Sequence, residues 1–155
     1  MKKPFSLMLC LAALLCLLSG CAADRQAERS LSQTRERMLA AAELPEMRSV
    51  NAQSDDAQRK LSTITDVDYD KVMDFFIDYA ADGAGYEISV IELKDKNDCS
   101  AVAESLETHK SRRIEQYRFY APDQVPRAEK ARVSVKGRRV AFVMCDDVEA
   151  VMKEF

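Results

Sequence analysis

Few side chains in this chain of 155 residues could act as a nucleophile, a general base or a metal ligand. His109 is the single histidine, and Cys99 and Cys145 are the cysteines that follow residue 21. Cys99 falls at the expected start of a helix, where the helix dipole can lower the pKa of a thiol. His109 follows ten residues later, about 15 Å along a helix, so the two do not form a catalytic dyad. Cys145 is distant from His109 in sequence and can approach it only if the tertiary fold brings them together. A histidine near apolar helix residues is more often packed against the core than catalytic.

Three acidic residues alternate like the ligands that open a calcium-binding loop. Asp66, Asp68 and Asp70 match the first, third and fifth positions of such a loop. The match then ends, because Lys71 stands where the turn needs glycine and Ile77 where a bidentate glutamate is needed. A solvated acidic turn is the better explanation. We therefore predict no bound metal or cofactor and keep the three aspartates as weak metal candidates.

The amino-terminal segment has the organisation of a cleaved signal peptide. Lys2 and Lys3 precede an apolar run over residues 7–18, which is too short to span a bilayer because a spanning helix needs about 20 apolar residues. Ser19 and Gly20 supply the small side chains that a signal peptidase accepts. We predict that residues 1–20 are removed.

Leu18, Ser19, Gly20 and Cys21 together resemble the lipobox of bacterial lipoproteins. The resemblance implies that Cys21 becomes the first residue of the mature protein, with a diacylglyceryl group on its sulfur and acyl chains such as palmitate. Two or three chains hold a protein stably on a membrane, whereas one chain binds only marginally. We therefore predict a lipid-anchored protein on the extracytoplasmic face of the cell membrane, with residues 21–30 as its tether. The alternative is an ordinary secretory signal that leaves Cys21 as a spare thiol.

The remaining chain is long enough for one domain with a hydrophobic core, which we place at residues 31–155. Cys99 and Cys145 would meet an oxidising compartment and could pair, but two cysteines are not a disulfide framework. Buried free thiols are the favoured interpretation.

Helical spacing of apolar residues predicts a helix over residues 30–42, which Leu44 and Pro45 end. Ser54, followed by two acids, predicts the amino-terminal cap of a short helix that continues to about Ile64. Alternating apolar residues predict a strand over residues 72–79, although a helix over residues 69–81 also fits the spacing. A turn at residues 82–85 leads to a second strand over residues 86–93.

The second half of the chain predicts the order helix, strand, strand, helix. The long helix begins near residue 97 or 98 and continues to about residue 118. Gly137 and Arg138 form a two-residue loop between strands over residues 132–136 and 139–145, and a helix over residues 148–155 ends the chain. We therefore predict an α+β fold in which an antiparallel four-stranded sheet has its helices packed on one face and is preceded by amino-terminal helices.

Four short segments carry a resemblance to a known family: residues 86–90 (YEISV), 93–95 (LKD), 120–122 (YAP) and 133–137 (VSVKG). They resemble an uncharacterised family of small clostridial-type lipoproteins, the domain-of-unknown-function family numbered four-three-five-eight. The resemblance implies a lipoprotein of a Gram-positive-type host and covers most of the chain from about Leu44 onward. No activity is assigned to that family, so the resemblance identifies no functional residue.

Charge is distributed unevenly along the chain. Residues 43–108 hold 16 acids and 6 bases, whereas residues 108–139 hold 10 bases and 3 acids. All of these bases except Arg118 are candidate contacts with an anionic surface: Lys110, Arg112, Arg113, Arg127, Lys130, Arg132, Lys136, Arg138 and Arg139. The alternative is that they pair with the acidic segments across the sheet.

Two functional hypotheses follow. The favoured one is a non-catalytic binding module of the cell envelope, whose partner is an envelope protein, a wall polymer or an anionic lipid, and not a nucleic acid. The alternative is a small-ligand or metal-binding protein, or an envelope enzyme, that uses His109, the Asp66, Asp68 and Asp70 cluster or a thiol. The sequence leaves enzymatic activity undecided.

Overall fold

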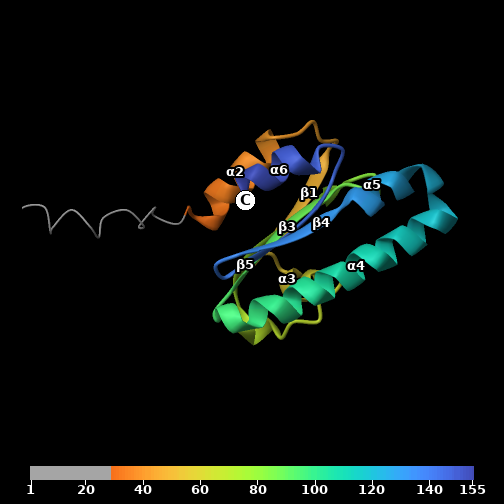
Figure 1. Ribbon diagram of the computed structural model, residues 1–155. Coiled ribbons are helices and arrows are strands. Elements are labelled where there is room, and N and C mark those ends of the chain that lie inside the picture. Colours follow the sequence, from red (N-terminus) through yellow and green to blue (C-terminus); the bar gives the residue numbers. More distant parts are fainter. Residues whose placement is uncertain (1–28) are drawn as a thin grey trace, which may run out of the picture.

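The computed structural model describes residues 29–155, which form a sheet with helices on both sides (Figure 1). The predicted signal peptide, the lipobox with Cys21, and the tether as far as residue 28 lie outside the described residues.

The sheet has five antiparallel strands in the order β1-β2-β3-β5-β4. The strands are β1 (Met47–Asn51), β2 (Val72–Ala80), β3 (Glu87–Leu93), β4 (Arg132–Lys136) and β5 (Arg139–Met144). All four predicted strands are present, and the strand interpretation of residues 72–79 is confirmed over the helical one. The predicted number of four is wrong, because β1 contains a single buried side chain, Val50, and lacks the alternation that identifies a strand.

Five α-helices accompany the sheet within the described residues: α2 (Leu31–Ala40), α3 (Ala57–Leu61), α4 (Cys99–Tyr120), α5 (Val125–Lys130) and α6 (Val148–Glu154). The three short 3-10 turns are η2 (Tyr69–Lys71), η3 (Lys96–Asp98) and η4 (Pro122–Gln124). The sequence did not predict α5, and α3 begins after Asp56 rather than at Ser54. Ser54 instead accepts the backbone N–H of Asn51 at 3.0 Å, which closes the turn after β1. None of the helices in residues 29–155 combines the length and the apolar character needed to cross a membrane.

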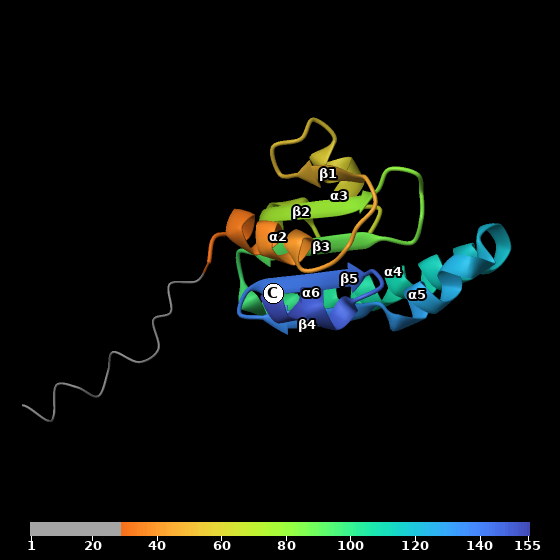
Figure 2. The same cartoon turned by 90° about the horizontal axis from the view of Figure 1, so that it is seen from above.

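The helices cover both faces of the sheet, so the predicted packing on one face is wrong (Figures 1 and 2). α3 and α4 pack on the face that carries Phe75 and Ile77 of β2, and α2 and α6 pack on the face that carries Phe76. β2 is therefore apolar on both sides. Asp78, which gave β2 its half-polar pattern, is itself fully buried, and Arg35 of α2 binds both of its carboxylate oxygens, at 2.8 and 2.6 Å.

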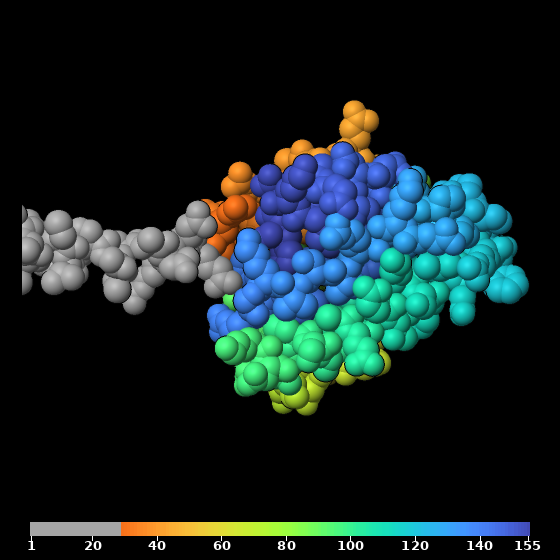
Figure 3. Space-filling view, viewed as in Figure 1, coloured from red at the N-terminus to blue at the C-terminus, as the bar shows by residue number. Residues whose placement is uncertain are grey.

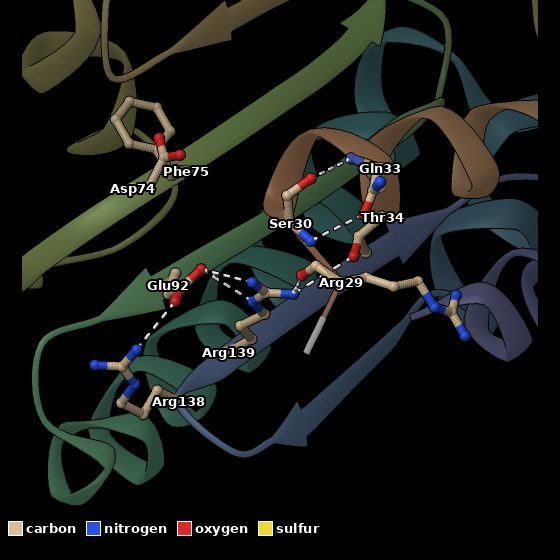
Figure 4. Close-up of polar contacts among 9 residues, drawn as sticks. All are labelled: Arg29, Ser30, Gln33, Thr34, Asp74, Phe75, Glu92, Arg138 and Arg139. Carbon is tan, nitrogen blue, oxygen red and sulfur yellow. Dashed lines mark hydrogen bonds and ion pairs between the residues drawn. The ribbon is translucent and has the colours of Figure 1, made fainter. Parts of the chain in front are cut away.

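The start of α2 is fixed by local hydrogen bonds. The Ser30 hydroxyl accepts the backbone N–H of Gln33, and the Gln33 side chain accepts the backbone N–H of Ser30, which forms a capping box (Figure 4). Leu31 and Met38 then point from α2 into the core beside α6. In the space-filling view, α6 in dark blue lies directly against α2 in orange, so the two helices close one face together (Figure 3).

A buried ion pair joins β3, β5 and the start of α2. Glu92 and Arg139 are direct partners across the two strands, and the Arg139 Nε donates to the Glu92 carboxylate at 3.0 Å. The Arg139 Nη1 also donates to the Arg29 carbonyl oxygen at 2.7 Å (Figure 4). The side chains of Glu92 and Arg139 are only 10 % exposed, so each charge depends on the other for compensation.

We expect Glu92→Ala to lower the free energy of unfolding by about 3–5 kcal/mol, because it leaves the Arg139 guanidinium buried among neutral oxygens. Urea unfolding would measure this loss. Arg138→Ala is the control: Arg138 also binds Glu92, but its side chain is 40 % exposed, so we expect a loss below about 1 kcal/mol. Similar losses for the two variants would contradict the structural role given to the buried pair.

Candidate functional site

A cleft of about 520 Å³ lies between α3, α4 and the turn that joins β2 to β3. Ile64 and Ile77 form apolar parts of the wall of the cleft. Lys60 comes from α3, while His109, Arg112 and Arg113 come from successive turns of α4. The cleft therefore combines segments that are about 50 residues apart in sequence.

His109 and Glu87 form a buried pair in this cleft. The His109 Nε2 lies 3.2 and 3.1 Å from the two carboxylate oxygens of Glu87, and both side chains are less than a tenth exposed. The ring of Phe142 meets the imidazole edge-on, with 5.3 Å between the ring centroids. An imidazole N–H directed between two carboxylate oxygens fixes the ring and satisfies the buried charge of Glu87.

Three cations line the same cleft, and none of them has a carboxylate partner among the described residues. The Lys60 Nζ lies 3.7 Å from the centre of the Tyr79 ring, a cation–π contact. Arg113 donates to the Gln116 side chain at 3.1 Å and to the Tyr117 hydroxyl, and its Nε is buried without a hydrogen-bond partner. Arg112 is exposed at the rim and makes no side-chain hydrogen bond to the described part of the chain.

The turn that forms one wall of the cleft is attached to the far end of α4. The Gly85 N–H donates to the Gln124 side-chain oxygen at 2.9 Å, and a Cβ on Gly85 would lie only 3.2 Å from that oxygen. A larger residue at position 85 would therefore crowd the Gln124 side chain. Gln124 also accepts from Arg127, so the turn and α5 are held in one network.

The same network continues into a charge cluster at Asp146. The Asp146 carboxylate accepts from the Arg127 Nε at 2.8 Å and from the Tyr86 hydroxyl at 2.7 Å. The Arg127 hydrogen bond, with a further contribution from Tyr86, lowers the pKa of Asp146 below its ordinary value. The pKa of the Tyr86 hydroxyl is raised, chiefly because it donates to Asp146.

The basic residues predicted to meet an anionic surface have different partners. Four are in ion pairs: Arg127 with Asp146, Arg132 with Glu149, and Arg138 and Arg139 with Glu92. Lys110 and Lys136 donate to backbone carbonyl oxygens. Arg112, Arg113 and Lys130 have no acidic partner among residues 29–155, and two of these three line the cleft.

The three aspartates named as weak metal candidates do not converge. Asp68 accepts the backbone N–H of Asp70, which caps η2, and Asp66 lies beside Ser105 of α4. Lys71 directly follows this segment, and its ammonium group binds Asp98 at 2.7 Å. The Lys71 side chain therefore supplies a positive charge beside these acids. Within the described residues, no group of three or more His, Cys, Asp or Glu side chains could hold a metal ion.

Cys99 and Cys145 are free and buried, so the favoured interpretation of buried free thiols is confirmed. Cys99 packs in the core cluster of α4, whereas Cys145 packs in the cluster of α2 and α6, and the sheet separates them. For the same reason Cys145 does not reach His109, which lies on the α4 face. Burial raises the pKa of both thiols, for Cys145 to about 11.

The sequence directed attention to His109, Arg112 and Arg113, and the structure brings these three together. Lys60 and Glu87 were missed as site residues. A signal for Glu87 exists, because it begins a mostly apolar strand, and a carboxylate there has to be compensated if the strand is buried. No comparable signal exists for Lys60, which follows another base, Arg59, in a short helix.

These features define an α+β domain with a two-sided sheet and a positively charged cleft. The model of the family described as Domain of unknown function (DUF4358) matches residues 46–145, and the chain belongs to this family. The matched residues include all five strands and the cleft, whereas α2 and α6 lie outside them. No curated protein and no solved structure matches the chain.

We expect the neutral form of His109 to carry its proton on Nε2, because both oxygens of Glu87 require a donor at that position. Long-range ¹H–¹⁵N correlation spectra of the imidazole would distinguish the two tautomers. A proton on Nδ1 with a bare Nε2 would mean that His109 does not donate to Glu87.

The raised pKa of Cys145 also predicts how stability depends on pH. An unfolded thiol has a pKa of about 8.5, below that of Cys145 in the folded state, so the folded state binds the thiol proton more tightly. This proton contributes its full share to the free energy of unfolding below about pH 8.5. This contribution is lost as the pH rises through the window from about 8.5 to about 11. Urea unfolding of the native chain and of Cys145→Ala between pH 8 and pH 10.5 should give a shallower decline for the variant. Identical declines would show that the thiol does not contribute.

Proposed function

We propose that this protein is a non-catalytic binding protein of the cell envelope, anchored through a lipid on Cys21, and that the cleft beside α4 is its binding site. The observation that carries the proposal is the set of three cations, Lys60, Arg112 and Arg113, around a buried His109–Glu87 pair. The three cations stand out because they line one cleft and none of them has a carboxylate partner among the described residues.

The surroundings of His109 favour binding over catalysis. Its Nε2 is used by Glu87, and an edge-on Phe142 covers the ring. A histidine that activates a nucleophile needs that nucleophile within hydrogen-bond reach. Cys145 packs on the opposite face of the sheet, and Cys99 is hydrogen bonded to the Gly137 carbonyl oxygen at 3.7 Å.

Support for the anchor comes from the sequence of the first 21 residues, where the lipobox follows a short apolar segment. The described domain is compatible with that anchor, since its first residue, Arg29, lies at the surface at one end of the sheet (Figure 1). A lipid at Cys21 would keep the domain at the outer surface of the membrane.

We expect cells that express the native chain to incorporate labelled palmitate into it and to retain it in the membrane fraction. Cys21→Ala should abolish the label and release the protein or leave it as an unprocessed precursor. Cys99→Ala is the matched control, because it removes a buried thiol and should leave label and location unchanged. Label that persists in Cys21→Ala would overturn the anchor assignment.

A further inference from the structure

We infer that the cleft binds a small water-soluble organic anion, whose carboxylate or phosphate group lies among Lys60, Arg112 and Arg113. The inference rests on the proposed function, because it takes the cleft to be the binding site and adds the chemical class of the ligand.

The charge balance of the cleft is the first argument. Glu87 is the one carboxylate among its lining residues, and both of its oxygens already lie against the His109 Nε2. Three cations are therefore left with no negative group in the described structure. Some bases elsewhere in the described structure do pair with acids, as Arg127 does with Asp146 and Arg132 with Glu149, whereas here three unpaired cations share one cleft. An anionic ligand would supply the missing partner.

The second argument is that two of the three cations, Arg113 and Lys60, are held in place before any ligand arrives. The Arg113 guanidinium lies over the Tyr117 ring, with 4.6 Å between the guanidinium carbon and the ring centre. Its Nη groups are fixed by Gln116 and Tyr117, which leaves the buried Nε as a donor without an acceptor. Lys60 is similarly placed over Tyr79 on the facing wall. Donors held in this way lose little entropy on binding, and guanidinium groups match the geometry of carboxylate and phosphate oxygens.

Size and lining indicate an organic ligand rather than an inorganic ion. The volume of about 520 Å³ falls within the range of about 300–1,000 Å³ typical of small-molecule sites. Tyr79 and Tyr86 line the cleft and are only half-buried, so the carbon skeleton of a ligand has aromatic surface to cover. The charged group would then lie toward the rim, where Arg112 is exposed.

The position of the cleft favours a soluble ligand over a lipid headgroup. Arg29 is bound by Arg139 at the Glu92 end of β3, whereas the cleft includes Glu87 at the other end of that strand. A strand of seven residues is about 20 Å long. Figures 1 and 2 both place the start of the described chain and the β2–β3 turn at opposite ends of the sheet. A membrane close to Arg29 would therefore be distant from the cleft.

The test uses the full lipidated chain in detergent micelles and isothermal titration calorimetry. The probes are succinate, sn-glycerol 3-phosphate and inorganic phosphate, with uncharged glycerol as the matched control. We expect succinate or glycerol phosphate to bind, inorganic phosphate to bind at least tenfold more weakly, and glycerol not to bind. Raising the salt concentration should weaken the binding.

Variants connect the binding to the cleft. Arg112→Gln and Lys60→Gln should each lower the affinity at least tenfold, because each removes a charge-assisted hydrogen bond. Neither side chain has a polar partner in the described structure, so the fold should be unaffected. Arg118→Gln is the matched control, since it removes one positive charge from the exposed part of α4 without lining the cleft, and it should leave the affinity unchanged.

Several outcomes would overturn the inference. Binding that persists in Arg112→Gln and Lys60→Gln would place the anion elsewhere. Binding only to vesicles of phosphatidylglycerol, and not to free glycerol phosphate, would make the ligand a headgroup. Binding of uncharged or cationic compounds that Arg113→Gln or His109→Phe abolishes would reject the anion but keep the cleft as a binding site. No binding by a library of compounds of any charge would reject both the ligand class and the proposed function.

Discussion

The sheet depends on the compensation of three carboxylates that its two central partners, β2 and β3, bury. Asp78, Glu87 and Glu92 are each less than a tenth exposed, so each needs a cation or a hydrogen-bond donor from an element packed against the sheet. Arg35 of α2 reaches Asp78, His109 of α4 reaches Glu87, and Arg139 of β5 reaches Glu92. The three pairs thus fix α2 on one face, α4 on the other and β5 beside β3. Apolar packing drives these elements together, while the pairs determine where they sit.

The cleft is a consequence of this arrangement. Glu87 holds α4 at His109, near the end of the sheet, and α4 continues beyond the sheet toward α5 (Figure 1). The next turn of the helix then places Arg112 and Arg113 in the lining of the cleft. The β2–β3 turn, held by Gln124 through the close approach at Gly85, completes the wall. A pair that stabilises the core therefore also places the cations at the rim.

Much of the fold was predictable from local patterns, because strands and amphipathic helices repeat along the chain at fixed periods. The alternation in residues 72–79 and the loop at Gly137 predicted β2 and the β4–β5 hairpin correctly. The prediction that the helices pack on one face failed because Asp78 made one side of β2 look polar. Nothing in the local sequence indicates that Arg35 covers this carboxylate. Lys60 was not predicted as a site residue for a similar reason. Its role depends on α3 lying opposite α4, and that arrangement comes from tertiary packing alone.

The hydrogen bond from Arg139 to the Arg29 carbonyl has a mechanical consequence. A pull applied at Arg29, where the described chain begins, would be shared between α2 and the guanidinium of Arg139. That guanidinium belongs to β5, which is paired to a strand on each side, and it is also held by Glu92. A pulling force would therefore act on an interior strand of the sheet as well as on α2, and α2 would not detach alone. A domain attached in this way can resist unfolding from its amino-terminal end, and Glu92 becomes the point on which that resistance depends.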